Sequence, residues 1–313
     1  MHGLLLLLSL GGVWLGTELA VRSARQIARR FHLSELFVGM TILAIGTDAP
    51  EMVLSITAAI HRLGGAETSG LVLGGAIGSC LGQISLVLGI AGLVGYLTIG
   101  PRRIWREGVM LVGAIVLFFL TGLDGTYSRI DGGILLTAYA IYFGLLLRSE
   151  HAGVREKSPP ATVPGLWALA MCLSGLAIVV GSAHFALREA LALCDAWGIE
   201  QTVVGIVILG VGTSLPELAL SISAVHKKAG ALSVGNILGS NTFDMLVPTG
   251  SAALIAGLRV TEPRMLFLDL PVLLGVTLLA LACFRRRRGL QRPEALLLLG
   301  TFVAYAVVRL ALG

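Results

Sequence analysis

Hydrophobic and polar positions follow one another in long blocks along this chain of 313 residues. Apolar runs are separated by short segments rich in Lys, Arg, Gly and Pro, and a helix needs about 20 mostly apolar residues to cross a bilayer. The pattern predicts ten such helices, at residues 3–21, 34–60, 69–97, 104–122, 130–147, 164–187, 200–225, 231–257, 264–284 and 293–311. We therefore expect an all-α integral membrane protein with ten transmembrane helices.

One polar, proline-rich segment divides these helices five from five. It covers residues 149–163 and separates a first repeat, 1–148, from a second, 164–313. An odd number of spans in each half places the halves in opposite orientations across the membrane. Two inverted five-helix repeats are a common plan of secondary transporters, whose site lies at the midplane where broken helices meet.

Two sequence motifs recur in the two halves. GMTILAIGTDAPEMVLSI at 39–56 matches GIVILGVGTSLPELALSI at 205–222, and GGAIGSCLGQISL at 74–86 matches GNILGSNTFDMLV at 235–247. The first motif places Gly, Thr, Pro and Glu in the middle of an apolar run. Helix breakers and charges are costly at that depth unless they line a protected site.

The glutamates of the first motif, Glu51 and Glu217, are the leading candidates for ion binding. Each follows Gly-Thr-x-x-Pro, and proline leaves a carbonyl oxygen of the preceding turn without its helical donor. Hard cations such as calcium take about 6–8 oxygen ligands of this kind. The alternative is local capping of a restarted helix, because Ser214 with Glu217, and Asp48 with Glu51, resemble capping boxes.

The second motif adds polar residues to both halves. A spacing of four places Ser79 with Gln83, and Ser240 with Asp244, on one helical face. An aspartate in the middle of a span is a functional candidate by default. The glycines of this motif could equally serve close helix packing; they are Gly74, Gly78 and Gly239.

These paired motifs resemble those of the sodium/calcium exchanger superfamily, the cation/calcium antiporters. The match is carried by GTSLPE at 212–217 and GNILGSN at 235–241, and the chain is similar over its whole length to compact prokaryotic members. The resemblance implies a secondary antiporter that exchanges calcium, or a similar divalent cation, for sodium. It implies that Glu51 and Glu217 bind the metal together with the backbone carbonyls of Thr47 and Thr213.

The resemblance also implies roles for the other motif residues. The hydroxyls of Ser79, Ser214 and Ser240 correspond to ligands of flanking sodium sites. Asp244 corresponds to an acidic or amide position at the centre, and Gln83 is its partner in the first repeat. The first helix of each half is expected to slide across a fixed core.

The first repeat departs from the family pattern. Asp48 stands where serine is usual, Gly75 and Cys80 replace asparagines, and Gln83 replaces another. Four buried carboxylates could then share one cluster, and they cannot all be ionised when it is empty, so protons could compete with cations. We hypothesise that Asp48 changes the coupling ion; the alternative is that it caps the helix or faces a water-filled vestibule.

Composition supports a membrane protein and excludes several other classes. Hydrophobic residues make up 56% and charged residues 13%, against about 25% charged residues in soluble domains. No basic segment with interleaved aromatics suggests nucleic acid, no Cys pairing suggests a metal or redox site, and no phosphate loop or nucleophile–base arrangement suggests an enzyme. We expect no cofactor other than the transported ions, and no obligate protein partner.

The distribution of Lys and Arg predicts the orientation. Most of the 23 basic residues lie in the odd-numbered loops and the central linker, which the positive-inside rule places in the cytoplasm. Both termini are then extracytoplasmic, in a plasma membrane of prokaryotic inner-membrane type. A proton-coupled exchanger remains an alternative, and so does a cation channel or a non-transporting ion sensor on the same fold.

Overall fold

A computed structural model describes residues 2–151, 162–196, 214–287 and 289–311. The regular secondary structure of this part of the chain is helical except for four strands of two residues each. The helices are α1 (His2–Phe31), α2 (Glu35–Val38), η1 (Gly39–Leu43), α3 (Ala44–Thr47), α4 (Ala49–Leu63), α5 (Ser69–Leu81), η2 (Gly82–Val87), α6 (Leu88–Val94), α7 (Pro101–Thr121), α8 (Arg129–His151), α9 (Gly165–Ala196), α12 (Leu215–His226), α13 (Gly230–Ala256), η4 (Met265–Asp269), α14 (Leu270–Arg287) and α15 (Arg292–Ala311), where η marks a π-helical turn. The strands are β1 (Leu97–Thr98), β2 (Thr126–Tyr127), β3 (Leu258–Arg259) and β4 (Gly289–Leu290).

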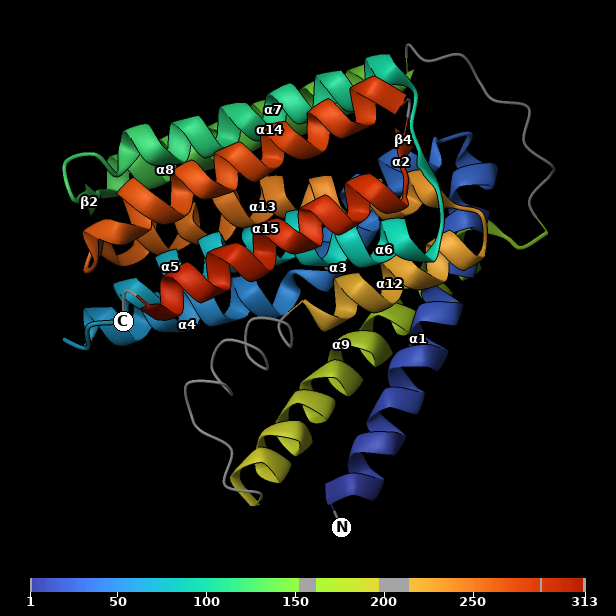
Figure 1. Cartoon of the computed structure of the whole chain (residues 1–313), viewed down its shortest axis with the longest axis horizontal. Helices are drawn as coiled ribbons and strands as arrows, with labels where there is room; N and C mark the ends of the chain where they lie inside the picture. Colours follow the sequence, from blue (N-terminus) through green and yellow to red (C-terminus); the bar gives the residue numbers. More distant parts are fainter. Residues whose placement is uncertain (1, 152–161, 197–213, 288, 312–313) are drawn as a thin grey trace.

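Most helices run roughly along one axis and form a single body (Figure 1). α13 lies at its centre and packs against α4, α5, α7, α8 and α12. α1 and α9 pack along each other and extend obliquely away from the body. The sequence therefore predicted the helical membrane fold correctly, while the central place of α13 emerges only from the packing.

Short strand pairs join the two halves of the chain at opposite ends of the body. β1 pairs with β4 through Leu97 and Leu290. β2 pairs with β3 through Tyr127 and Leu258. Each pair therefore holds one strand from each half. We call the end with β1 and β4 the basic end, because the Arg-rich C-terminal part of α1 lies there, and we call the other the opposite end.

Six described helices are long and apolar enough to cross a membrane, and the number rises to seven if the bent pair α2–α3 with α4 is one span. The expected boundaries hold to within a few residues for most of them. α1 is an exception, because it continues from the expected end at residue 21 to Phe31. The arginines at 22–30 are therefore helical rather than in a loop, since Ala24, Ile27 and Ala28 continue the buried apolar face. α8 likewise continues to His151, into the expected linker, and α9 continues from the expected end at residue 187 to Ala196.

The break predicted by the first motif falls at Asp48, where α3 and α4 meet at an angle of 46°. Asp48 has φ −87° and ψ 2°, and Pro50 stands in the first turn of α4. Ser214, its counterpart in the second copy of the first motif, has φ −92° and ψ 12°, with Pro216 in the first turn of α12. Neither side chain makes a capping hydrogen bond among the described residues, so the capping-box interpretation is wrong for both.

The glycines of the second motif differ between the two halves. A Cβ at Gly239 would lie 2.6 Å from the backbone of Met40, and one at Gly235 would lie 2.4 Å from the carbonyl oxygen of Leu36. α13 thus touches α2 and η1 backbone to backbone. At Gly78, the counterpart of Gly239, no described atom lies within 4 Å of an added Cβ. The packing interpretation therefore holds for Gly239 and not for Gly78.

We expect Gly239→Ala to destabilise the protein and Gly78→Ala to leave its stability nearly unchanged. The added methyl group at Gly239 must push one backbone from another, and such overpacking costs about 1–3 kcal/mol. Thermal unfolding of the two purified variants in the same detergent measures the difference. Equal unfolding temperatures would show that the close contact of α13 with η1 does not support the fold.

Candidate ion-binding site

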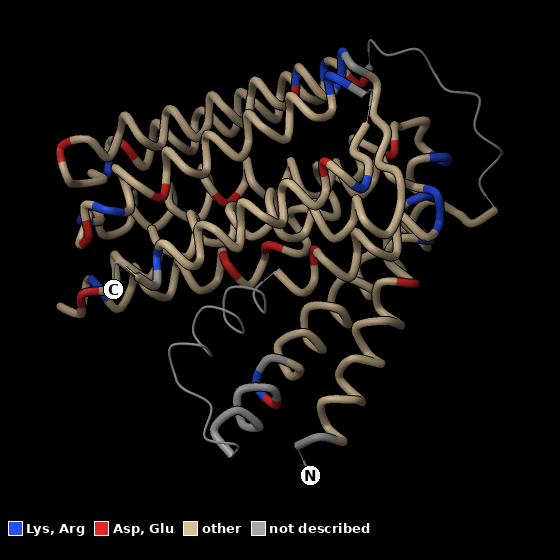
Figure 2. Tube along the Cα trace, viewed as in Figure 1, with Lys and Arg blue, Asp and Glu red and all other residues tan. Residues whose placement is uncertain are grey.

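Four carboxylates lie in the interior of the helical body, at the broken helices and on α13. Asp48 stands at the break between α3 and α4, Glu51 in the first turn of α4, Glu217 in the first turn of α12 and Asp244 on α13. Asp48, Glu217 and Asp244 are buried, and Glu51 is half-buried. Figure 2 shows acidic residues in the middle of the body, whereas basic residues lie mainly toward its ends.

The four carboxylates lie close enough to feel one another's charge. Asp48 interacts electrostatically with the other three. Glu51 interacts with Glu217 and Asp244, and these two interact with each other. None of the ion pairs within the described residues involves any of the four. Buried negative charges without a cationic partner are very costly, so this cluster requires bound cations or protons.

Several buried oxygen atoms around the carboxylates have no hydrogen-bond partner among the described residues. They include both carboxylate oxygens of Asp48 and Glu217, Oδ1 of Asp244, and the hydroxyls of Ser214 and Ser240. Buried polar atoms normally have a hydrogen-bond partner. An ion that binds at the site would explain why these atoms have none. Carboxylate and hydroxyl oxygens are the ligands that sodium-like and calcium-like hard cations prefer.

A hydrogen-bond network holds the second-motif residues together across the two halves. Gln83 Nε2 donates to Ser79 Oγ at 3.1 Å and to Asp244 Oδ2 at 3.3 Å. Asn241 Nδ2 donates to Gln83 Oε1 at 2.7 Å. Gln83 and Asp244 occupy corresponding positions of the two motifs, so the repeat counterparts are in direct contact. The network orients Oδ2 of Asp244. Oδ1 has no hydrogen-bond partner among the described residues and could bind a ligand.

The structure brings together all the sequence-predicted site residues that it describes. Thr47, Ser79, Gln83, Ser214 and Ser240 are buried. Thr47, Ser214 and Ser240 lie on or next to elements that carry a carboxylate. Ser79 and Gln83 lie on α5 and η2 and join Asp244 through the hydrogen bonds of Gln83. The Thr47 hydroxyl lies 3.1 Å from the carbonyl oxygens of both Leu43 and Ala44 and donates to the backbone of the preceding turn. Thr213 lies outside the described residues.

No three described His, Cys, Asp or Glu side chains converge closely enough to hold one metal ion by themselves. An ion at this cluster would therefore need further oxygen ligands in addition to carboxylates. The helix break supplies one source, because Pro50 has no N–H to donate to the carbonyl oxygen of Gly46. The arrangement thus fits ions that accept mixed carboxylate, carbonyl and hydroxyl ligands.

Two residues near the cluster were not among the predicted ligands. Asn241 joins the network through Gln83, and the sequence places it among the polar residues of GNILGSN, beside Ser240. Tyr139 on α8 lies within electrostatic range of Asp48. It belongs to an apolar run without a motif, so nothing in the sequence distinguished it from a packing residue.

Comparison with known proteins identifies relatives over the whole chain. Residues 1–148 and 167–311 match the profile of the sodium/calcium exchanger protein family. Sodium/calcium exchanger MaX1 of Methanosarcina acetivorans is 28% identical over 349 aligned positions, with 97% of each chain covered. Inner membrane protein YrbG of Escherichia coli is 30% identical, with 91% of this chain and 89% of that protein covered.

Solved structures with the same fold belong to the sodium-calcium exchanger NCX_Mj. One of them, soaked without sodium and calcium, superposes with a TM-score of 0.83 at 27% identity and covers 99% of this chain and 98% of that one. Another was soaked with 2.5 mM Na⁺ and 0.1 mM Ca²⁺ and superposes with a TM-score of 0.82. The fold, the buried acidic cluster and the relatives thus all indicate the same protein family.

Proposed function

Because the chain belongs to the sodium/calcium exchanger family, we propose that it is a secondary active antiporter that exchanges calcium, or a similar divalent cation, for sodium. The observation that carries this proposal is the buried cluster of four carboxylates without a cationic partner among the described residues. A cluster of this kind binds cations from either side only if the protein can open to both sides. The names of MaX1 and NCX_Mj, both sodium/calcium exchangers, support the choice of ions.

We assign the ligands by their places in the two sequence motifs. Glu51 and Glu217 bind the divalent cation together with the backbone carbonyls of Thr47 and Thr213. The remaining ligands serve sodium or complete the centre of the site; they are Asp48, Ser79, Gln83, Ser214, Ser240 and Asp244. The burial of the described members of this set, and their unsatisfied oxygens, support the assignment.

We propose that the ten predicted helices form two inverted repeats, 1–148 and 164–313, joined by a cytoplasmic linker at 149–163. Three observations support this architecture. Asp48 and Ser214 have nearly the same backbone conformation, Gln83 contacts its counterpart Asp244, and the strand pairs β1–β4 and β2–β3 are reciprocal between the halves. A two-fold axis in the membrane plane would relate all three.

Exchange follows from competition at the shared carboxylates. Sodium ions and a divalent cation cannot occupy the same oxygen ligands together, so entry of one ion releases the other. α1 and α9 are the elements that would move, because they pack on each other and extend away from the body. Gly16 and Gly175 meet at their crossing, where an added Cβ would lie 2.9 Å or less from the facing backbone. The two helices can therefore slide as one rigid pair.

We propose a plasma membrane of prokaryotic inner-membrane type as the location, with the basic end in the cytoplasm and both termini outside. The Arg-rich end of α1, with Arg22, Arg25 and Arg29, supports the orientation through the positive-inside rule. The name of YrbG, an inner membrane protein, supports the compartment.

Calcium uptake into proteoliposomes tests the proposed function. We expect radiolabelled calcium to enter vesicles loaded with sodium and diluted into sodium-free buffer, and not to enter vesicles with equal sodium on both sides. Uptake with a pH gradient alone would indicate the proton-coupled alternative. Calcium flux that is independent of every counter-ion would indicate a channel, and ion binding without flux would indicate a sensor; either result would contradict the antiporter proposal.

A further inference from the structure

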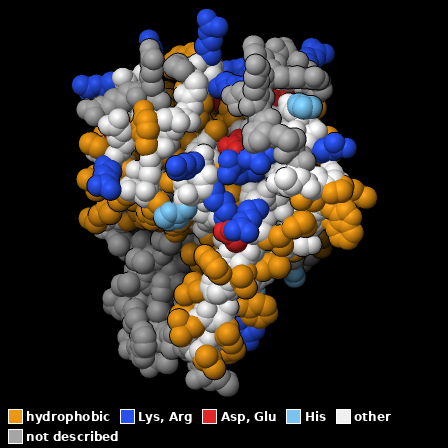
Figure 3. Space-filling view, turned by 90° about the vertical axis from the view of Figure 1, so that its right-hand side faces the viewer, with side chains coloured by type: hydrophobic (Ala, Val, Ile, Leu, Met, Phe, Trp, Pro, Cys, Tyr) orange, Lys and Arg blue, Asp and Glu red, His pale blue; other side chains and the backbone are white. Residues whose placement is uncertain are grey.

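A cationic pocket opens at the basic end, away from the acidic cluster. It has a volume of about 460 Å³ and lies where α1 and the start of α9 meet the C-terminal end of α12. Figure 3 shows the face that carries this end, where Lys and Arg side chains gather with few acidic side chains between them. The pocket residues are Arg22, Ser23, Arg25, Gln26, Arg29, Val163, Ala168, Met171 and Lys227.

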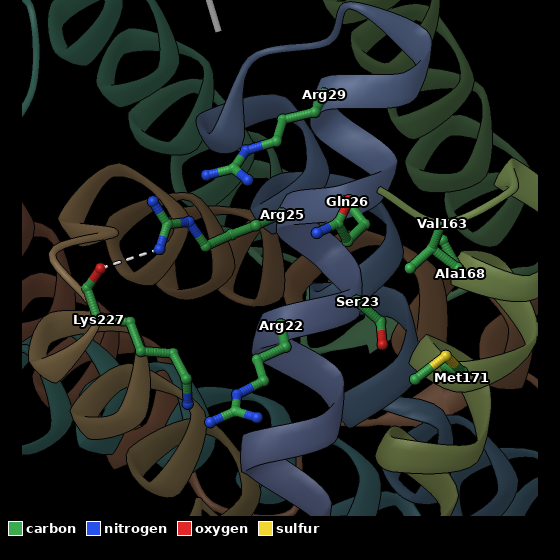
Figure 4. A pocket seen from close by; sticks show the side chains of 9 residues that line it. All are labelled: Arg22, Ser23, Arg25, Gln26, Arg29, Val163, Ala168, Met171 and Lys227. Atoms are coloured by element: carbon green, nitrogen blue, oxygen red, sulfur yellow. Dashed lines mark hydrogen bonds between the residues drawn. The ribbon is translucent and has the colours of Figure 1, made fainter. Parts of the chain in front are cut away.

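The pocket has a cationic side and an apolar side (Figure 4). Arg22, Arg25 and Arg29 extend from α1 toward Lys227, while Val163, Ala168 and Met171 lie on the other side of α1. Arg25 Nη1 donates to the carbonyl oxygen of Lys227 at 3.1 Å, which holds α1 against the end of α12. Charge and apolar surface are thus combined in one concave site.

The positive charge of the pocket exceeds the acidic charge that the described residues provide. Arg25 pairs with Glu35 at 2.9 Å. Arg22 and Lys227 share one carboxylate, that of Glu18. Arg29 has no ion-pair partner among the described residues. Four cations therefore meet two carboxylates, and the pocket retains an electrostatic attraction for an anion.

The chemistry of the pocket fits a phosphate group that carries an apolar tail. Guanidinium groups bind phosphate oxygens through several parallel hydrogen bonds. The N-terminal turn of α9 beside the pocket is strongly exposed, with Leu166 at 80% and Trp167 at 67%. Large exposed apolar and Trp side chains next to a basic cluster are typical of the membrane interface. A free phosphate ion would use only the cationic side.

We propose that this pocket binds the phosphate headgroup of an anionic membrane lipid. The headgroup contacts Arg22, Arg29 and Lys227, and the acyl chains lie along the exposed apolar start of α9. A lipid in this place bridges α1 to α12. If the proposed function is right and α1 moves relative to the body, the lipid would also influence the rate of exchange.

Lipid-dependent thermal stability of the whole protein tests the proposal without any transport measurement. The purified chain is titrated with phosphatidylglycerol, with phosphatidylcholine and with inorganic phosphate, each in the same detergent. We expect stabilisation by phosphatidylglycerol alone. Each cation near the membrane surface contributes about 1 kcal/mol to binding of anionic lipid. Loss of two cations, in Arg22→Gln with Arg29→Gln, should therefore raise the lipid concentration at half effect about 30-fold.

A matched control removes two positive charges outside the pocket. Arg285 and Arg286 are exposed on α14 at the basic end and are not part of the pocket, so Arg285→Gln with Arg286→Gln should leave the titration unchanged. Equal loss in this control and in the pocket variant would show diffuse attraction and overturn the proposal. Stabilisation by inorganic phosphate to the same extent would identify a free-phosphate site and overturn it too. Because these outcomes do not depend on calcium uptake, they stay separate from a failure of the antiporter proposal.

Discussion

Glu217→Gln protein is expected to take up no calcium above the level of protein-free vesicles, under a sodium gradient in which we expect the unaltered protein to take up calcium. Glu217 is fully buried, and both its carboxylate oxygens lack a partner among the described residues. Loss of a group that only hydrogen-bonds to a metal ligand already lowers the affinity for the metal by about 10–100-fold. Loss of a charged ligand should therefore exceed about 100-fold, while the glutamine keeps the size of the side chain.

Two further variants make this result specific to the site. Glu51→Gln should be equally inactive, because Glu51 holds the corresponding position of the first repeat. Glu67→Gln is the matched control, since Glu67 lies between α4 and α5 and pairs with Arg62 at 2.5 Å. The Arg62 guanidinium lowers the pKa of Glu67 to about 2, so this control removes a carboxylate that is charged under the assay conditions. Normal uptake by Glu217→Gln would refute the assignment of this glutamate as a ligand.

Asp48→Ser protein is expected to lose much of the pH dependence of calcium uptake and to keep uptake driven by a sodium gradient. Asp48 is fully buried among three other carboxylates and has no cationic partner among the described residues. A group in that position is neutralised either by a bound cation or by a proton, so we expect protons to compete with transported ions there. Coupling between two ligands is typically about 5–150-fold, and inhibition by protons should weaken by at least about fivefold.

The repeat offers a matched test of this effect. Ser214 is the counterpart of Asp48, with nearly the same backbone conformation and a buried, unpartnered hydroxyl among the described groups. If proton competition needs one extra carboxylate at either break, Asp48→Ser combined with Ser214→Asp should restore the pH profile. A pH profile of Asp48→Ser that equals that of the unaltered protein would make Asp48 a local variation without a part in coupling.

The placement of Asp48 narrows the alternatives that its sequence position leaves open. A capping role is wrong, because its side chain caps no helix among the described residues. A position in a water-filled vestibule does not fit its complete burial. The remaining hypothesis, that Asp48 takes part in ion or proton binding, is the one that the two variants above test.

The helices and the candidate residues of the site could be predicted because short stretches of the sequence determine them. Apolar runs of bilayer length predict spans through their hydrophobicity alone, and Gly-Thr-x-x-Pro-Glu predicts a break through the missing N–H of proline. The break at Asp48 follows this rule, as do the matching positions of Pro50 and Pro216. A carboxylate in such a place is a functional candidate whatever its neighbours are.

Contacts between segments far apart in the chain depend on tertiary packing, which the hydrophobic pattern of the sequence does not reveal. Gly239 and Gly78 are equivalent in the repeat, but only Gly239 lies close to another backbone, that of Met40, whereas the space at Gly78 is open. The bond from Gln83 to Asp244 and the approach of Tyr139 to Asp48 arise in the same way. The extension of α1 to Phe31, which places Arg22 and Arg29 beside Lys227, depends on the burial of one helical face against α9 and α12. The class of protein, the spans and the candidate ligands thus follow from the sequence. The geometry of the acidic cluster and of the cationic pocket, in contrast, arises only where helices distant in the chain meet.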